Sequence, residues 1–137
     1  MSMHFNPVHF NDQHFRAMLP PPSTRFGRLL VRAGDVAEIL MAETSSTDDY
    51  GNPIYSYSNV CFTHVALRIL RPDERFLIPG TAETAEAIGI FEPTVEVARG
   101  YRVDTRENGS WQVLYVKRLV SHGRVHHLEA YLKRVES

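Results

Sequence analysis

The sequence predicts a mostly β protein: a small antiparallel β-barrel or sandwich with one short helix and an extended N-terminal arm. Apolar and polar residues alternate over several segments of the second half, as they do in half-buried strands. Dipeptides that contain glycine separate these segments at short intervals, which is typical of hairpin turns. The length of 137 residues and the apolar content of 43% suit one domain with a single core.

Residues 1–26 form a segment that differs from the rest of the chain. The segment shows neither helical nor strand periodicity, and a His-Phe pair recurs in it at intervals of five residues. We interpret it as an extended arm that lies on a neighbouring subunit. The alternatives are phenylalanines that pack on the parent domain, or a disordered leader. The expected subunit-contact residues are Phe5, Phe10, Phe15, Pro20, Pro21 and Pro22.

The domain proper is expected to span residues 27–137 and to begin with two short strands. Residues 27–32 are a short apolar run that ends before a glycine. Residues 36–42 are ambiguous, because Asp35 and Glu38 have the spacing of a capping box that would open a helix. The segment is short and is followed by a run of Thr and Ser, so a strand is the better interpretation.

A dense turn signal at residues 48–53 separates the first strands from the next one. Gly51 and Asn52 supply the positive φ angles that tight turns need. Pro53 has no N–H to donate and therefore suits the first residue of a strand. Residues 60–70 then alternate, with Thr63 and Val65 on one face and Phe62 on the other.

Residues 72–92 interrupt the strand pattern and are expected to form a loop or helix insert. Within them, residues 81–88 are the best helix candidate of the chain, with Thr81 or Thr84 as the N-cap and Gly89 as the stop.

The C-terminal part is expected to consist of consecutive antiparallel strands. They cover residues 94–98, 101–104, 111–120 and 124–135, and a glycine-containing turn precedes each of the last three. The expected core residues are Val65, Leu67, Ile69, Trp111, Val113, Tyr115, Leu128 and Leu132.

The composition narrows the functional classes. A net charge of -1 and a pI of about 6.6 argue against a general nucleic-acid-binding protein, which is usually clearly basic. No run of 18 apolar residues predicts a membrane span, and the first 25 residues lack the layout of a secretory signal. Cys61 is the single cysteine, so neither an intrachain disulfide nor a cysteine-rich zinc site is expected, which fits a reducing compartment.

Two groups of residues suggest chemistry without forming a site. Cys61 and His64 are three residues apart on a predicted strand, so they point to opposite faces, and Cys61 is better explained as a small core residue. His122, His126 and His127 resemble a metal cluster, but neighbouring residues of a strand face opposite sides. We therefore expect no catalytic residues, no metal and no cofactor.

The C-terminal third has a mild excess of positive charge. Residues 99–137 contain eight Lys or Arg residues against four Asp or Glu residues. Such an excess suits contact with DNA phosphates or, equally well, with acidic patches on a partner subunit.

Six segments follow one another in a set order along the chain: residues 36–41, 48–53, 60–72, 100–103, 111–116 and 126–130, with a variable insert between the third and the fourth. This order over residues 36–135 resembles that of the head-closure, or head–tail connector, proteins of tailed bacteriophages. The resemblance implies a small β-barrel without enzymatic activity that forms a homo-oligomeric ring in the neck of the virion. Assembly of the virion would take place in the host cytoplasm. Such a ring lies below the portal and its adaptor, extends the DNA channel, helps to hold the packaged DNA without sequence-specific binding, and provides the platform for tail attachment.

Three other functions stay open at this point. The first is a different virion β-module, such as a tail terminator, a baseplate protein or a capsid-decorating protein. The second is a small enzyme or metal-dependent module that uses Cys61, His122 or His126. The third is an oligonucleotide-binding barrel, for which salt-dependent binding of a single strand would be the test.

Overall fold

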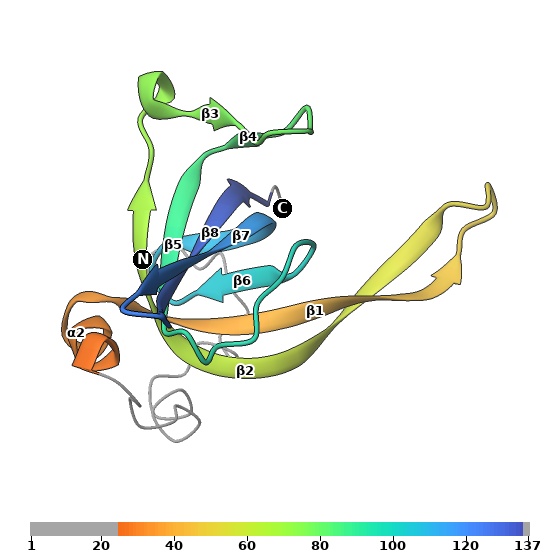
Figure 1. Cartoon of the computed structure of the whole chain (residues 1–137). Helices are drawn as coiled ribbons and strands as arrows, with labels where there is room; N and C mark the ends of the chain where they lie inside the picture. The colour runs from red at the N-terminus through yellow and green to blue at the C-terminus, as the bar shows by residue number, and fades with distance from the viewer. Residues whose placement is uncertain (1–24, 136–137) are drawn as a thin grey trace.

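The computed structural model describes residues 25–135 and confirms the mostly β, antiparallel architecture (Figure 1). Six strands close into a barrel in the order β1-β2-β5-β8-β7-β6, and all neighbouring strands run antiparallel. The barrel strands are β1 (Asp35–Thr47), β2 (Pro53–Ile69), β5 (Ala87–Phe91), β6 (Arg102–Thr105), β7 (Gly109–Ser121) and β8 (Arg124–Arg134).

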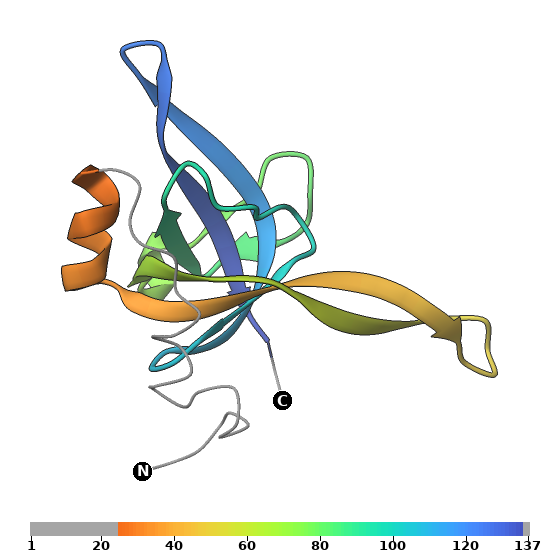
Figure 2. The ribbon, with the colours of Figure 1, turned by 90° about the horizontal axis from the view of Figure 1, so that it is seen from below.

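The strands differ greatly in length, and this difference shapes the molecule. β6 pairs with β1 only over residues 37–40, and β5 pairs with β2 only over residues 66–69. The longer strands continue past these short neighbours as two-stranded hairpins that project from the barrel in diverging directions (Figure 2). We refer to residues 41–59 as the β1–β2 hairpin and to residues 117–127 as the β7–β8 hairpin.

The barrel interior holds the main core. Trp111, Phe91 and Ile39 are its largest fully buried side chains. Gly89 lies in the middle of β5, where a Cβ atom would come within 3.1 Å of Leu132 Cδ1 and therefore has little room. The indole Nε1 of Trp111 donates a hydrogen bond to the Asn108 carbonyl oxygen at 3.0 Å, so this buried ring has its polar atom satisfied.

Five of the eight expected core residues are buried, and two are not. Ile69 is 48% exposed, because it is the last residue of β2 and lies at the end of the barrel wall. Tyr115 is 47% exposed, because a register shift between Val113 and Tyr115 interrupts the alternation of side chains. Leu114, the extra residue, is buried in a second cluster with Ile78 and Ala85. Leu67 is half-buried, and the confirmed core residues are Val65, Trp111, Val113, Leu128 and Leu132.

The strand expected at residues 27–32 is wrong, because this segment lies within helix α2 (Arg25–Ala33). Gly27 and Leu30, three residues apart, are buried, whereas Leu29 and Val31 are exposed. That spacing is helical, and the helix lies next to β2. The expected boundary between the arm and the domain at residue 26 therefore falls inside a helix.

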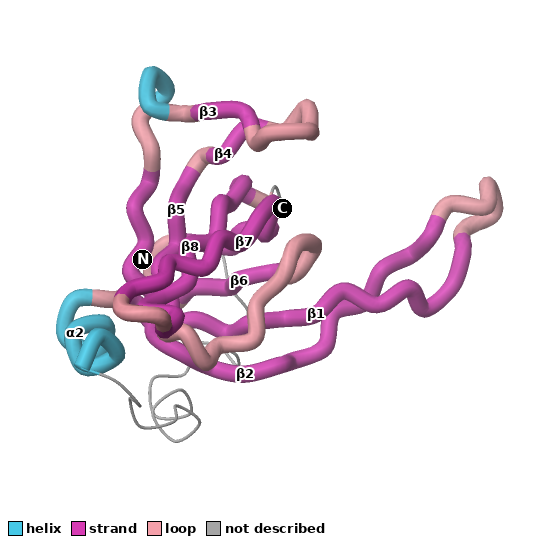
Figure 3. Tube along the Cα trace, viewed as in Figure 1, coloured by secondary structure: helices cyan, strands magenta, loops and turns pink. Residues whose placement is uncertain are grey.

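The helix expected at residues 81–88 is also wrong (Figure 3). The hydroxyl of Thr81 accepts a hydrogen bond from the Glu83 N–H at 3.1 Å and donates one to the Ile78 carbonyl at 3.0 Å, which makes a local turn instead of a helix cap. The chain then enters β5, a strand of the barrel. Residues 72–86 hold the 3-10 helix η1 (Pro72–Glu74) and a small two-stranded sheet, β3 (Phe76–Leu77) with β4 (Thr84–Ala85).

Residues 94–98, expected as a strand, are irregular and connect β5 to β6. Val97 in this connection is buried in the main core, so its apolar character serves packing without strand pairing. The other expected strands of the C-terminal part are confirmed as β6, β7 and β8, and the strand interpretation of residues 36–42 is confirmed as part of β1.

Candidate functional site

The β1–β2 hairpin presents an acidic surface that is rich in tyrosine. Residues 41–59 contain no Lys or Arg and carry a formal charge of -3 from Glu43, Asp48 and Asp49. Its tip residue Tyr50 is 90% exposed, and Tyr55 is 58% exposed. Large exposed aromatic side chains on a projecting element are typical of a contact surface.

The tip of this hairpin is well ordered by its own hydrogen bonds. Asp48 Oδ1 accepts hydrogen bonds from the Asn52 N–H at 2.8 Å and from the Tyr50 N–H at 2.9 Å, and the Gly51 N–H donates to the Asp48 carbonyl at 3.0 Å. The bond from the Asn52 backbone, followed by those from the Tyr50 backbone and the Asn52 side chain, lowers the pKa of Asp48 despite a smaller opposing effect of desolvation. The carboxylate therefore stays ionised in a preorganised turn.

Polar contacts also fix the place where the β1–β2 hairpin leaves the barrel. The amide Nδ2 of Asn59 donates to Glu38 Oε2 at 2.9 Å across the two strands. The guanidinium of Arg102, which bonds Asp104 at 2.7 Å, lies 5.5 Å from the centre of the Tyr57 ring. The hairpin is thus anchored at its base and free of the barrel beyond it.

The β7–β8 hairpin presents the opposite charge. Its basic residues are Lys117, Arg118 and Arg124. Lys117 pairs across the strands with Glu129, so the hairpin has an excess charge of +2 with the histidines counted as neutral. Val120, next to the tip, is 65% exposed. His122 and Gly123 form the two-residue turn with φ angles of 53° and 76°, the positive pair that a type I′ hairpin needs.

His126 and His127 contact each other on this hairpin, so the expectation that neighbouring strand residues keep these rings apart is wrong. Their Nδ1 atoms are 2.8 Å apart, and His127 Nε2 lies 3.5 Å from Glu129 Oε2. The register of β7 with β8 shifts at this point, because Leu119 pairs with His127 and Val120 pairs with Val125. His126 is therefore the extra residue of a β-bulge, which breaks the alternation of side chains and allows the two rings to meet.

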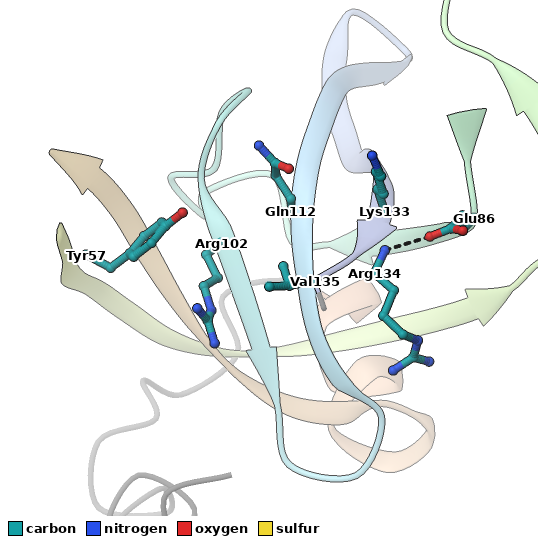
Figure 4. Close-up of a pocket in the computed structure, with 7 residues that line it drawn as sticks. All are labelled: Tyr57, Glu86, Arg102, Gln112, Lys133, Arg134 and Val135. Carbon is teal, nitrogen blue, oxygen red and sulfur yellow. Dashed lines mark hydrogen bonds between the residues drawn. The ribbon is translucent and has the colours of Figure 1, made fainter. Parts of the chain in front are cut away.

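An open hollow of about 500 Å³ lies on the barrel wall near the base of the β1–β2 hairpin (Figure 4). The Glu86 carboxylate accepts a hydrogen bond from the Arg134 backbone N–H at 2.8 Å and lies 3.8 Å from the Arg75 guanidinium. The Arg134 guanidinium stacks 4.2 Å from the centre of the Trp111 ring. Glu86 and Arg134 therefore both have partners within the protein. The residues that line the hollow are Tyr57, Glu86, Arg102, Gln112, Lys133, Arg134 and Val135.

Cys61 and His64 lie on β2 and have the environments of structural residues. Burial, together with the nearby Glu96 carboxylate, raises the pKa of the Cys61 thiol, so the thiol stays protonated at neutral pH and is a poor nucleophile. Desolvation lowers the pKa of His64, so its imidazole is held mainly neutral.

Two kinds of feature are absent from residues 25–135. No group of three or more His, Cys, Asp or Glu side chains in this part of the chain is placed to hold a metal ion, so His122 does not complete a site with His126 and His127. No helix of the described part is long and apolar enough to cross a membrane.

The subunit-contact residues expected in the arm are not placed by these observations. Phe5, Phe10, Phe15, Pro20, Pro21 and Pro22 all lie outside the described residues. Their role stays a prediction.

The two charged hairpins are the surfaces that the sequence reasoning missed. Unusual strand length is the feature that indicates a projecting hairpin. β1 and β2 have 13 and 17 residues, whereas strands of globular proteins usually have about 3–10. The sequence did indicate the positive charge of the C-terminal third, but the charge pattern alone does not reveal that part of it lies on a projecting hairpin.

No protein-family model matches the chain, and a search of curated proteins finds no match either. The resemblance to head-closure proteins therefore stays a prediction that these comparisons do not support.

Proposed function

We propose that this protein is a structural subunit of the neck of a tailed bacteriophage, where a ring of identical copies joins the portal and its adaptor to the tail. The observation that supports the proposal is a closed barrel from which two hairpins project with exposed side chains. Such hairpins bury little surface within their own chain, and their form suits contact with neighbouring subunits.

In this role the barrel is a rigid building block and the ring encloses the channel for packaged DNA. A formal net charge of -1 suits a channel through which DNA passes without being held tightly, because a strongly basic surface would bind the phosphates. The ring closes the filled head and gives the tail its platform.

The N-terminal arm is proposed to strengthen the ring by lying on the next subunit. Deletion of residues 2–24 is expected to weaken assembly and to leave the barrel folded, because the six barrel strands of the described part all lie within residues 35–134. Full rings of the truncated protein at the normal concentration would contradict this role.

The test of the function is the mass of the purified protein by light scattering, alone and after mixing with portal, adaptor and tail proteins of a phage that encodes it. Joining of the protein to those partners in a ring-sized complex is the expected result. A protein whose mass stays unchanged in the presence of these partners under all conditions would refute the proposal. Immunogold labelling of virions separates the neck from the alternative positions, since a tail terminator, baseplate or capsid-decorating protein would be labelled elsewhere.

A further inference from the structure

We propose that the acidic β1–β2 hairpin of one molecule docks against the basic β7–β8 hairpin of a second copy of this chain. This proposal rests on the proposed function, because the two hairpins would be the surfaces through which neighbouring subunits of the ring join. The physical argument for it comes from the charge, exposure and placement of the two hairpins.

Charge complementarity is the first step. The β1–β2 hairpin carries a formal charge of -3 without any basic residue. The β7–β8 hairpin carries an excess of +2 once Glu129, the cross-strand partner of Lys117, is counted. Helix α2 has three Arg residues and no acidic residue, and residues 76–98 have four Glu residues and no basic residue, so they also carry a single sign. The two hairpins differ from them in projecting from the barrel as pairs of strands (Figure 2). Opposite potentials on two surfaces favour and orient their encounter.

The placement of the hairpins is the second step. In the closed strand order, the β1–β2 pair and the β7–β8 pair lie on opposite sides of the barrel, with β5 and β6 between them. The hairpins diverge from the barrel, so their tips do not meet within one molecule (Figure 2). The complementary surface must come from another copy, and a contact between two different surfaces of identical subunits repeats from one copy to the next.

The exposed side chains suit this contact. Tyr50 and Tyr55 on the acidic hairpin offer ring faces on which the guanidinium groups of Arg118 and Arg124 can stack. Tyrosine and arginine are the residue types that contribute most to protein interfaces. Exposed Val120 adds an apolar contact close to the basic groups.

Double-stranded DNA is the competing occupant of the basic hairpin. DNA would account for the positive charge there but not for the acidic, tyrosine-rich surface of the other hairpin. A second copy accounts for both surfaces with one contact, so it is the occupant that we propose.

The experiment reverses the charge of one hairpin at a time in the full chain and measures self-association by sedimentation velocity at low ionic strength. The acidic hairpin is changed by Glu43→Lys with Asp49→Lys. Asp48 is left intact, because its carboxylate holds the turn. The basic hairpin is changed by Arg118→Glu with Arg124→Glu. Each double variant is expected to self-associate at least about tenfold more weakly than the wild type, since both of its hairpins then carry the same sign.

Mixing the two double variants is the decisive step. One variant has two basic hairpins and the other has two acidic ones, so the equimolar mixture is expected to recover association to within about threefold of the wild type. The single variants Glu96→Lys and Arg99→Glu serve as controls, because these exposed residues lie on the β5–β6 connection and not on a hairpin. They are expected to associate like the wild type.

Several results would overturn the hairpin contact. They are a wild type that stays monomeric up to about 1 mM, double variants that associate normally, or a mixture that does not recover. Unchanged self-association with loss of duplex DNA binding in the Arg118 and Arg124 variant would assign the basic hairpin to DNA instead. A wild type that stays monomeric alone but joins portal and tail proteins would refute this contact and leave the proposed function standing.

Discussion

The Asp35 side chain ties the start of β1 to the turn between β6 and β7. Its carboxylate is buried and accepts three hydrogen bonds. The donors are the Val36 N–H at 2.8 Å, the Glu107 N–H at 3.0 Å and the Asn108 side-chain amide at 3.0 Å. Because β1 and β6 are neighbours in the closed barrel, this carboxylate fastens the seam where they meet.

Replacement of Asp35 by Ala is expected to lower the free energy of unfolding by about 1–3 kcal/mol, because it leaves one buried and two part-buried donors without their acceptor. Urea denaturation measures the change. Asp73→Ala is the matched control, since the Asp73 side chain is 76% exposed, and its effect should stay within about 0.5 kcal/mol. Equal effects of the two substitutions would contradict the role of Asp35.

Two of the expected core residues, one buried and one exposed, give a second prediction at this scale. Leu132→Ala is expected to cost about 2–5 kcal/mol, because Leu132 is fully buried and its loss leaves a cavity. Ile69→Ala is expected to cost much less, since Ile69 is 48% exposed at the end of β2. Denaturant titration of both variants checks the difference, and a larger loss for Ile69→Ala would show that the end of the barrel wall is packed differently.

His64 gives a prediction about pH. Desolvation lowers its pKa in the folded protein below the ordinary value of 6.5, with a further lowering by Arg106 and opposing effects of Glu92 and Asp35. The unfolded chain therefore binds a proton first as the pH falls below 6.5, and this group makes the folded state progressively less stable until its folded pKa is reached. Above 6.5 both states are neutral, and the contribution no longer changes.

The measurement for His64 is the free energy of unfolding between pH 7.5 and 5 for the wild type and for His64→Gln. The wild type should lose more stability than the variant over this range. The two proteins differ at this position alone, so the difference between the two curves isolates His64. Parallel curves would contradict the assignment.

At the scale of whole elements, the strands were largely predictable and the helix was not. Alternation and glycine turns identified β7 and β8, because these strands have one covered face over much of their length. The run of Leu29, Leu30 and Val31 suggested a strand, although only Leu30 of the three is buried. In residues 81–88, Ala and Glu favour a helix locally, but the pairing of β5 with both β2 and β8 overrides that preference. Such pairing between distant segments leaves no trace in local sequence.

The turn of the β7–β8 hairpin gives a prediction for one element. His122 adopts a φ of 53°, a left-handed conformation that raises the conformational energy of most residues other than Gly and Asn. His122→Asn is therefore expected to stabilise the protein by about 0.5–1 kcal/mol, because Asn-Gly is the preferred pair for this turn. A thermal melt measures the gain. Gly123→Ala, at a φ of 76°, is the opposite control and should destabilise the protein.

At the scale of the whole molecule, stability and interaction surface belong to different parts of the chain. The closed barrel leaves no unpaired edge around its core, and the core residues belong to the barrel and its connections. The two hairpins contribute charge and exposed aromatic residues instead. A building block of this kind can change its contact surfaces without losing its fold.

This separation leads to a last prediction, in which the β1–β2 hairpin is shortened. Residues 43–56 are removed and the paired residues Ala42 and Tyr57 are joined through Asn-Gly. Every described side chain in the removed segment is exposed, so the barrel is expected to keep a cooperative melt within a few degrees of the wild type. The same variant should lose self-association, since it lacks all three acidic residues of the hairpin. Circular dichroism follows the melt and sedimentation follows the association. A shortened protein that no longer unfolds cooperatively would mean that the hairpin helps to hold the barrel, and the division between the two parts would then be wrong.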